Sequence, residues 1–380
     1  MQTRRLLIVT LMLILLLPIS CGGKGEVEPI KIGVIAPITG SIPAVGESTV
    51  NAAKLAVQEI NNAGGLAVGD RQVPVELVIE DNEDKKEKAV SAAQKLINQS
   101  NVVAIVGPQA SRNAIPAASV AEEAHVPMIS PWSTNPETTA GKQYVFRVAF
   151  IDPFQGRVMA RFAIEELNTQ KAAVLYDVAS EYNKGIAEIF RQIYEGAGGQ
   201  VVAFESYTTG ETDFESQLAA IKESGAQVLF LPNYYNEVPL QVEQARNMGI
   251  TAAIIGSDAW GQIEADKLAE MEGFYFSTHY ATDIASPVAE RFIAAYEAAY
   301  GQVPDDVAAL TYDAFGMLFE AIKSQAKTDA ESIRNGLASI SRFEGVTGVM
   351  EYKGTGDPVK SAVILRIEDG HFRFYKLAEP

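Results

Sequence analysis

One short stretch of the sequence gathers hydroxyl side chains directly after an apolar run. In ISPWSTNP, at residues 129–136, a segment that reads as a short buried strand ends in Ser130, Ser133, Thr134 and Asn135, with Trp132 among them. Hydroxyl groups and free backbone N–H groups bind a carboxylate through hydrogen bonds without supplying a full counter-charge. The stretch therefore predicts a place where an anion is held by hydrogen bonds.

Polar and aromatic residues follow other apolar runs in the same way. Ser111 comes after VVAIVGP, Tyr182 after AVLYD, Tyr234 and Tyr235 after VLFLP, and Asp258 at the end of AIIGSD. In open α/β sheets, ligands bind beyond the carboxyl ends of the strands, near the N-termini of the following helices. The first half of the chain thus offers hydroxyls suited to a carboxylate, and the second half offers an acid and aromatic rings suited to a cation and an apolar body.

Each of these residues also has a simpler interpretation. Ser111 could cap the helix that follows it, since serine is a preferred N-cap residue. Thr134 could close a turn before the next proline, and Asp258 could be a solvated loop acid or a helix cap. The tyrosines could lie at half-buried loop edges, where this residue type is common. Trp132 has polar neighbours in the sequence, which favours a position in the wall of a pocket over one in the core.

The sequence lacks motifs for metal, nucleotide or covalent chemistry. EDNEDKKEK, at residues 80–88, lacks the ligand spacing of a calcium-binding loop, and the histidines at 125, 279 and 371 are far apart. GPQASRNA lacks the lysine of a phosphate-binding loop, and neither G-x-G-x-x-G after a strand nor G-x-S-x-G occurs. We expect no enzyme activity, no cofactor and no metal. The enzymatic alternative is a hydrolase with a pair of carboxylates in a cleft.

The residues between these positions alternate between strand and helix patterns. KIGVIAP reads as a strand, and Val50, Ala53, Val57 and Ile60 then recur on one helical face. The unit repeats through residue 130, with a helix expected at 111–123. A second set follows, with helices expected at 154–167, 182–195, 213–223 and 237–247. Helices between strands imply crossover connections, and therefore two α/β lobes with parallel sheets. The tail adds helices at 287–300 and 304–325 and short β segments.

Length predicts two lobes, charge argues against a nucleic-acid partner, and the first residues predict export. A chain of 380 residues exceeds what one core usually supports, and a formal net charge of -17 argues against a nucleic-acid partner. Arg4 and Arg5 precede an apolar run from Leu6 to Leu17, which is too short to span a bilayer and is typical of a signal peptide.

The end of the apolar run suggests a lipid attachment site. LLLPISCGG resembles the lipobox of bacterial lipoproteins, with Pro18 where that motif usually has leucine. The resemblance implies that Cys21 becomes a diacylated N-terminus, with GGKGEVEP as a flexible tether. An ordinary signal peptide cut elsewhere is the alternative. Cys21 is the single cysteine, so the remainder of the chain has neither a disulfide nor a cysteine ligand.

Nearly the whole chain after the tether resembles the substrate-binding proteins of branched-chain amino acid ABC transporters, which have the type I periplasmic-binding fold. The resemblance rests on motifs in a matching order: KIGVIAPITG, AVQEINNAGG, VELVIEDNEDKKEKAVSAAQKLI, VVAIVGPQASRNAIPAASVAEEAHVPMISPWSTNP, VLYDVASEYNKG, ETDFESQLAAIKESGAQVLFLP, QARNMGI and FEGVTGVMEYKGTGDPVK. It implies two similar doubly wound parallel-sheet lobes joined by a hinge of three crossings. Lobe I is expected at 30–150 and 282–357, lobe II at 151–281 and 358–378, after a signal peptide at 1–20 and a tether at 21–29.

The resemblance also assigns roles to residues of this sequence. Ser111 and Thr134 would bind a ligand carboxylate through hydroxyl and backbone N–H groups. The carbonyl of Trp132 would join Thr134 at the ammonium group, with Asp258 as its acidic partner. The set of ligand-binding residues that we expect is Ser111, Trp132, Ser133, Thr134, Tyr182, Tyr234, Asp258 and Tyr312.

Two departures from the family's pattern bear on the ligand side chain. Trp132 stands where a small residue is common, and Val45 stands where an aromatic residue is frequent. We expect a free amino acid, branched-chain or otherwise apolar, as the ligand. The resemblance further implies a monomer in the periplasm or at the cell surface, anchored to the membrane by its lipid, that delivers the ligand to ABC permease subunits. A ligand-sensing receptor module of the same fold, specific for a related small amino acid or amide, is the alternative.

Overall fold

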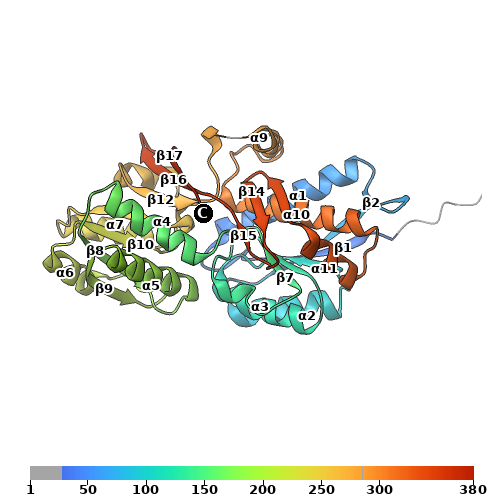
Figure 1. Ribbon diagram of the computed structural model, residues 1–380, viewed down its shortest axis with the longest axis horizontal. Helices are drawn as coiled ribbons and strands as arrows, with labels where there is room; N and C mark the ends of the chain where they lie inside the picture. The colour runs from blue at the N-terminus through green and yellow to red at the C-terminus, as the bar shows by residue number, and fades with distance from the viewer. Residues whose placement is uncertain (1–27, 285) are drawn as a thin grey trace, which may run out of the picture.

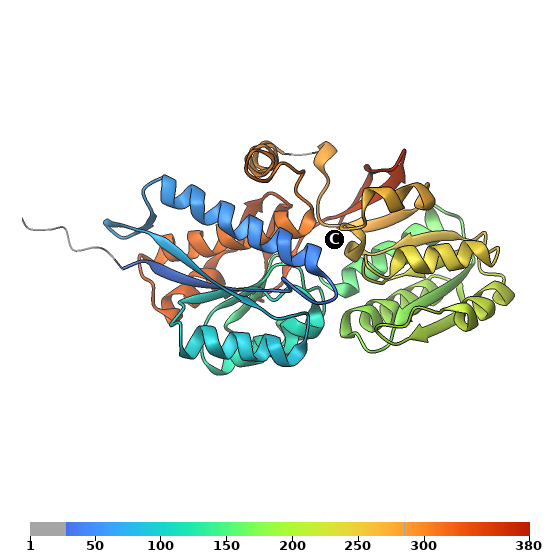
Figure 2. The ribbon, with the colours of Figure 1, turned by 180° about the vertical axis from the view of Figure 1, so that it is seen from behind.

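The computed structural model describes residues 28–284 and 286–380, and it contains two β-sheets that are each flanked by helices (Figure 1). The predicted signal peptide and the lipidation at Cys21 concern residues outside this part of the chain. Seen from behind, the two helix-covered sheets lie side by side along the long axis, with connecting segments between them (Figure 2). No helix within the described ranges combines the length and apolar character needed to cross a bilayer.

The first sheet is entirely parallel, with the strand order β4-β1-β5-β6-β7. Its strands are β1 (Ile30–Ala36), β4 (Val75–Asp81), β5 (Ala104–Val106), β6 (Met128–Ser130) and β7 (Val145–Arg147). The crossover helices are α1 (Pro43–Asn62), α2 (Lys86–Asn98) and α3 (Ser111–Glu123). Alanines and aliphatic side chains of α2 and α3 pack against the sheet strands in one buried cluster. The carboxyl ends of β5 and β6 therefore deliver the segments that begin at Gly107 and Pro131.

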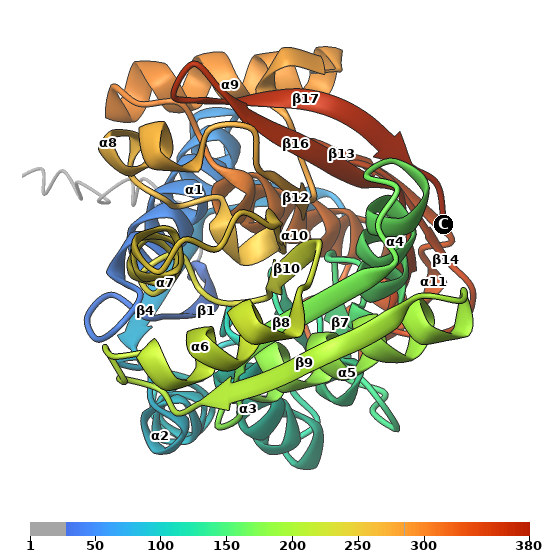
Figure 3. The same cartoon turned by 90° about the vertical axis from the view of Figure 1, so that its left-hand side faces the viewer.

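The second sheet has the order β17-β16-β12-β11-β10-β8-β9 and mixes directions. Its strands are β8 (Lys171–Asp177), β9 (Gln200–Tyr207), β10 (Val228–Leu231), β11 (Ala253–Gly256), β12 (Tyr275–Thr278), β16 (Ala362–Glu368) and β17 (His371–Ala378). Its helices are α4 (Asp152–Glu165), α5 (Glu181–Gly196), α6 (Glu215–Ser224) and α7 (Val238–Asn247). Strands β8 to β12 are parallel, as predicted, whereas the β16–β17 hairpin adds an antiparallel edge that the repeat pattern did not predict (Figure 3).

The rest of the chain covers the first sheet and links the two. Three helices of the tail pack on this side of the molecule: α9 (Pro287–Tyr300) and α10 (Asp306–Gln325) contact α1, and α11 (Ala330–Ser339) contacts α10. A small antiparallel sheet contains β13 (Arg342–Gly345), β14 (Gly348–Tyr352) and β15 (Pro358–Val359). A second small pair contains β2 (Leu66–Val68) and β3 (Arg71–Val73), and the short helix α8 (Ala265–Leu268) lies near α7. We call the elements around the first sheet, with α1, α2, α3, α9, α10 and α11, the first lobe, and those around the second sheet the second lobe.

The chain passes between the lobes three times, after β7, after β12 and after β15. The helices expected at 111–123 and 287–300 are found at those residues, and the other expected helices of the second half agree to within two residues at each end. Helix α11 was not predicted. This arrangement brings the carboxyl ends of the first lobe's strands to face those of the second.

Candidate functional site

A small buried cavity lies where the strand ends of the two lobes meet. Its volume is about 10 Å³, which is room for about one water molecule, so the closed form leaves little free space between the lobes. It is lined by Gln109, Ala110, Ser111, Trp132, Thr134, Tyr182, Tyr234 and Asp258. The first five come from the first lobe and the last three from the second, so the cavity is closed only when the lobes are together.

Ser111 begins helix α3 and does not cap it. Ala110 occupies the N-cap position without a side-chain hydrogen bond, so the capping interpretation of Ser111 is wrong. The Ser111 hydroxyl instead lies 2.9 Å from that of Ser133 and accepts the N–H of Asn135 at 3.4 Å. It stands at the positive end of a helix, where a carboxylate is favoured.

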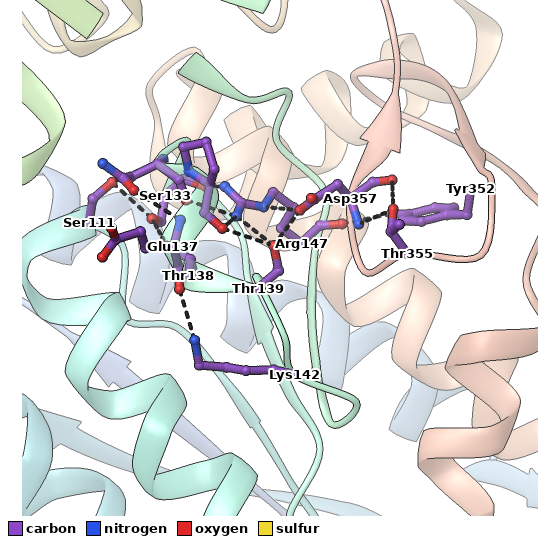
Figure 4. Close-up of polar contacts among 12 residues, drawn as sticks. Ser111, Ser133, Glu137, Thr138, Thr139, Lys142, Arg147, Tyr352, Thr355 and Asp357 are labelled. Atoms are coloured by element: carbon purple, nitrogen blue, oxygen red, sulfur yellow. Dashed lines mark hydrogen bonds and ion pairs between the residues drawn. The ribbon is translucent and has the colours of Figure 1, made fainter. Parts of the chain in front are cut away.

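A buried arginine holds the loop that follows β6. Arg147, at the end of β7, is fully buried, and its guanidinium donates to the carbonyls of Ser133 and Asn135 at 2.8 Å each (Figure 4). It also donates to the Thr139 hydroxyl at 2.8 Å and forms an ion pair with Asp357 at 2.6 Å. Because these carbonyls are tied back to the guanidinium, the loop presents a fixed face to the cavity. This explains structurally why the hydroxyls of ISPWSTNP gather at one place.

Thr134 is the loop residue whose hydroxyl is free for a ligand. Its Oγ1 atom is buried and has no hydrogen-bond partner among the described residues, while its carbonyl accepts the N–H of Asp152 at 2.9 Å. Ser133, by contrast, has its hydroxyl 2.7 Å from that of Thr138 and does not line the cavity. Burial raises the pKa of the Asp152 carboxyl to about 7, with the nearby Asp258 carboxylate acting in the same direction and the Thr134 side chain and Arg147 opposing it.

Asp258 lies on the opposite wall, in a short turn directly after β11. It is 1% exposed, and its Oδ1 atom accepts hydrogen bonds from the Tyr182 hydroxyl and, at 2.8 Å, from the Gln155 amide. Burial raises the pKa of Tyr182 well above its ordinary value, which keeps the phenol protonated as a donor. These neutral donors orient the Asp258 carboxylate but do not neutralise it.

The one basic neighbour of Asp258 among the described residues is His279, whose Nε2 atom lies 3.2 Å from Oδ2. Burial lowers the pKa of His279 to about 4, despite the opposing effect of Asp258. The imidazole stacks on Phe150 with ring centroids 3.7 Å apart. At neutral pH the histidine is therefore uncharged, and Asp258 faces the cavity as a buried carboxylate without a counter-charge.

Aromatic rings form the remaining wall. The Tyr234 ring lies between those of Tyr182 and Trp132, at centroid distances of 5.5 and 5.9 Å. The Arg112 guanidinium lies 4.5 Å from the centre of the Tyr234 ring and is itself paired with Asp84. This stack joins the lobes, since Tyr234 belongs to the second and Trp132 and Arg112 to the first.

Tyr312 does not line this cavity. It lies on α10, where its hydroxyl bonds to Glu59 and its ring packs against Phe292 at 4.7 Å between centroids. A helical face explains the placement, since Tyr312 points from α10 toward α1 and α9. Val45 is buried and is also absent from the lining, so its departure from the family's pattern does not shape the cavity directly.

Several residues of the site were not predicted. Gln109 and Ala110 precede Ser111 in QASRNA, and the same rule about strand ends could have identified them. Gln155 and His279 contact Asp258 from 103 and 21 residues away along the chain, and no local pattern marks them. Arg147 is of the same kind, because only the folded sheet places β7 beside the β6 loop.

A larger hollow lies elsewhere, between the start of α10 and the β16–β17 hairpin. Its volume is about 460 Å³, and it is open to solvent along the exposed side chain of Val303. Its lining contains none of the predicted site residues Ser111, Thr134 and Asp258. The small cavity is therefore the better candidate site. No cluster of three His, Cys, Asp or Glu side chains suited to a metal ion was found in the described ranges.

Comparison with known proteins gives a consistent result. A family model described as periplasmic binding protein matches residues 29–371. The leucine-, isoleucine-, valine-, threonine-, and alanine-binding protein of Pseudomonas aeruginosa is 30% identical over 334 residues, which is 87% of each chain. The leucine-binding protein LivK of Thermotoga maritima has a TM-score of 0.86 at 34% identity, covering 92% of this chain and 99% of that one. The branched-chain amino acid transporter substrate-binding protein LivJ of Streptococcus pneumoniae, in complex with isoleucine, has a TM-score of 0.86 at 34% identity, covering 93% and 100%.

Proposed function

The chain belongs to the periplasmic binding protein family, and on that premise we propose that it captures a free amino acid between its two lobes for delivery to an ABC permease. The observation that carries the proposal is the pair of opposite walls in one cavity. Hydroxyls at a helix N-terminus stand on one side, and the uncompensated carboxylate of Asp258 stands on the other. This arrangement suits a zwitterion, with its carboxylate toward Ser111 and Thr134 and its ammonium group toward Asp258.

Each contact has a physical basis. The free Oγ1 of Thr134 and the Ser111 hydroxyl would bind the ligand carboxylate, aided by the positive end of α3. The ammonium group would supply the counter-charge that Asp258 lacks, since a buried carboxylate without one is costly. Hydrogen bonds to charged groups contribute roughly 1.5 to 3 kcal/mol each, so three or four, less the ordering cost, give about 8 kcal/mol or micromolar affinity.

Binding and lobe closure would be coupled. Both lobes contribute lining residues, so a ligand that contacts both shifts the balance between open and closed forms by its differential affinity. Closure also excludes water and strengthens the charge interactions inside the cavity. A permease can then distinguish the closed, loaded protein from the open, empty one by its shape.

Calorimetric titration of the purified protein with a panel of free amino acids tests the binding step. We expect exothermic binding of at least one member with a micromolar Kd, and weak or no binding of its α-keto acid, which lacks the ammonium group. A folded protein, verified by circular dichroism, that gives no heat with any amino acid would refute the proposal.

Lipid anchoring and delivery are separate parts of the proposal. Cys21 would carry the acyl chains, so a Cys21→Ala protein should leave the membrane fraction while retaining amino acid binding. Uptake of the radiolabelled ligand by cells that lack the gene, with and without the restored gene, measures delivery to the permease. Equal uptake in both strains would mean that the protein does not feed a transporter for that ligand.

A further inference from the structure

Gln109 lines the cavity and has a polar side chain that the zwitterion contacts do not use. It follows β5 and lies two residues before Ser111, fully buried. Its amide nitrogen donates to the Thr311 hydroxyl at 3.4 Å, a long hydrogen bond. Its Oε1 atom is buried and has no hydrogen-bond partner among the described residues.

An unpaired amide oxygen in this position requires an explanation. Nearly all buried polar groups in folded proteins are hydrogen-bonded, because burial removes the water that would otherwise bond to them. A leucine or methionine would fill a similar space at lower cost if the group opposite were apolar. The partner missing from Oε1 is therefore expected on whatever occupies the cavity.

The lining residues divide into those that would hold the zwitterion and those that remain. Ser111 and Thr134 face a carboxylate, and Asp258, with Tyr182, faces an ammonium group. Gln109, Ala110, Trp132 and Tyr234 remain for the side chain of the ligand.

The space left for that side chain is small. The whole cavity of about 10 Å³ has room for about one water molecule in this closed form. Trp132 is held in place by its Nε1–H, which donates to Asp306 at 3.2 Å, and by the Tyr234 ring. A rigid indole therefore restricts the ligand to a short side chain.

We infer that Gln109 selects a ligand whose short side chain carries a hydroxyl group, which donates its hydrogen to Oε1 of this glutamine. The inference rests on the proposed binding of a free amino acid and narrows its ligand. A hydroxyl fits because it is compact, and a branched side chain of this kind has the same shape as valine. An apolar pocket discriminates poorly between a methyl and a hydroxyl group, whereas a buried group that needs a hydrogen bond rejects the ligand that lacks one.

Threonine and valine are the matched probes, because their side chains have nearly the same shape and differ by the hydroxyl. Calorimetry on the unaltered protein should show threonine binding at least tenfold more tightly than valine, and serine more tightly than alanine. If valine binds as tightly as threonine or more tightly, the inference is overturned while the proposed function stands. If no amino acid binds, the proposed function itself fails.

A substitution then tests the residue. Gln109→Leu should remove the preference, bringing the Kd ratio of valine to threonine close to one or inverting it. Gln94→Leu makes the same chemical change on the exposed face of α2 and should leave the ratio of the parent protein. A folded Gln109→Leu protein that keeps the threonine preference would exclude Gln109 as its cause. The comparison in the unaltered protein decides the ligand class even if this variant does not fold.

Discussion

At the scale of single residues, the site depends on a carboxylate without a counter-charge and a hydroxyl without a hydrogen-bond partner among the residues that the structure describes. Asp258 is the clearest case, because Tyr182 and Gln155 orient its carboxylate while His279 stays neutral. The unpaired Oγ1 of Thr134 is a case of the same kind on the opposite wall. A binding protein can keep such groups because the bound ligand supplies the missing counter-charge or hydrogen bond.

Replacing Asp258 by asparagine should weaken amino acid binding strongly. The ammonium group would lose its counter-charge in a buried setting, which typically costs about 2 to 5 kcal/mol. The melting temperature of the unliganded protein should stay the same or rise, because the variant removes a buried charge that has no cationic partner. Calorimetry and differential scanning fluorimetry measure the two effects.

Asp266→Asn is the matched control for this change. Asp266 is also in the second lobe, but its side chain is 68% exposed, so the same substitution should alter neither affinity nor stability. Unchanged affinity in Asp258→Asn would remove Asp258 from the site.

The residues that sequence reasoning took from strand ends lie together in the structure. Ser111, Trp132, Thr134, Tyr182, Tyr234 and Asp258 all follow apolar runs, and all line one cavity. The partners that orient them could not be predicted, because Arg147, Gln155 and His279 act through contacts formed only after folding. Tyr312 shows the opposite error, in which the family's pattern suggested a role and the face of α10 directs the side chain elsewhere.

At the scale of elements, the N-terminus of α10 links the lobes through two adjacent carboxyl groups. Asp305 caps the helix by accepting the N–H of Ala308 at 2.8 Å. Gln262, from the second lobe, donates to Asp306 at 2.8 Å and to Asp305 at 3.3 Å. Burial raises the pKa of Asp306 to about 8, and the neighbouring carboxylates of Asp305 and Asp258 act in the same direction.

Stability should therefore fall as pH rises from about 6.5 to 8. Folded Asp306 keeps its proton up to about pH 8, whereas the unfolded chain loses it near the ordinary value of 3.8, so the folded state binds more protons in this window. The free energy of unfolding should decrease by about 1 to 2 kcal/mol across the window, at up to about 1.4 kcal/mol per pH unit for one group. Urea unfolding at several pH values measures the slope.

Asp152 acts in the same direction as Asp306 but mainly below pH 7, because its folded pKa is about 7. The other groups with shifted pKa values near this range oppose the decline. His279, with a pKa of about 4 when folded against 6.5 ordinarily, makes stability rise with pH mainly below 6.5, and its remaining effect in the window is about 0.4 kcal/mol. Lys360, lowered to about 8 by burial, also makes stability rise with pH, mainly above pH 8. Asp306→Asn should reduce the decline to the smaller part below pH 7 that Asp152 supplies, and an unchanged slope between pH 7 and 8 in this variant would assign the decline to another group.

Helices α4 and α5 pack closely at a glycine, which gives a prediction about stability. A Cβ atom at Gly156 would lie 2.6 Å from a methyl carbon of Ile189 and 3.3 Å from the backbone nitrogen of Phe190. Gly156→Ala should therefore destabilise the second lobe by about 1 to 3 kcal/mol, less a helix-propensity gain of up to about 1 kcal/mol. Thermal or urea unfolding measures the net loss.

Gly196→Ala provides the comparison. Gly196 ends α5, and a Cβ atom there would meet nothing within 4 Å, so this alanine should be neutral or slightly stabilising. If both alanines had the same effect, the close contact between α4 and α5 at Gly156 would not be what destabilises the variant.

Elements were predictable to the extent that a local pattern defines them. The alternation of apolar runs and amphipathic stretches located α3, α5 and the central strands, because crossover units repeat that pattern in both lobes. The antiparallel β16–β17 hairpin and α11 fall outside the repeat. Their positions depend on which sheet edge and which helix face remain uncovered once the repeats have folded.

At the scale of the whole molecule, the lobes are closed on each other around the cavity. The backbone N–H of Ala44 donates to the Tyr235 hydroxyl at 3.2 Å, and the Asn135 side chain donates to the carbonyl of Glu181 at 3.1 Å. Lys86, at the start of α2, forms an ion pair with Glu181, at the start of α5. These contacts lie outside the cavity, so they act on ligand affinity only by favouring the closed form.

The ion pair between Lys86 and Glu181 provides a test of this coupling. Its side chains are 47% and 38% exposed, and exposed pairs of this kind contribute only about 0.2 to 1 kcal/mol. Lys86→Ala should therefore weaken ligand binding by at most about fivefold, chiefly through faster dissociation, and the difference from the parent protein should shrink at high salt.

Lys85, the preceding residue, pairs with Glu83 at 3.0 Å within the first lobe, so Lys85→Ala removes the same charge without touching the second lobe. Stopped-flow dissociation rates at two salt concentrations compare the variants. Only Lys86 has an ion-pair partner in the other lobe. Equal effects of the two alanines on the dissociation rate would therefore mean that net charge, and not contact between the lobes, causes the effect.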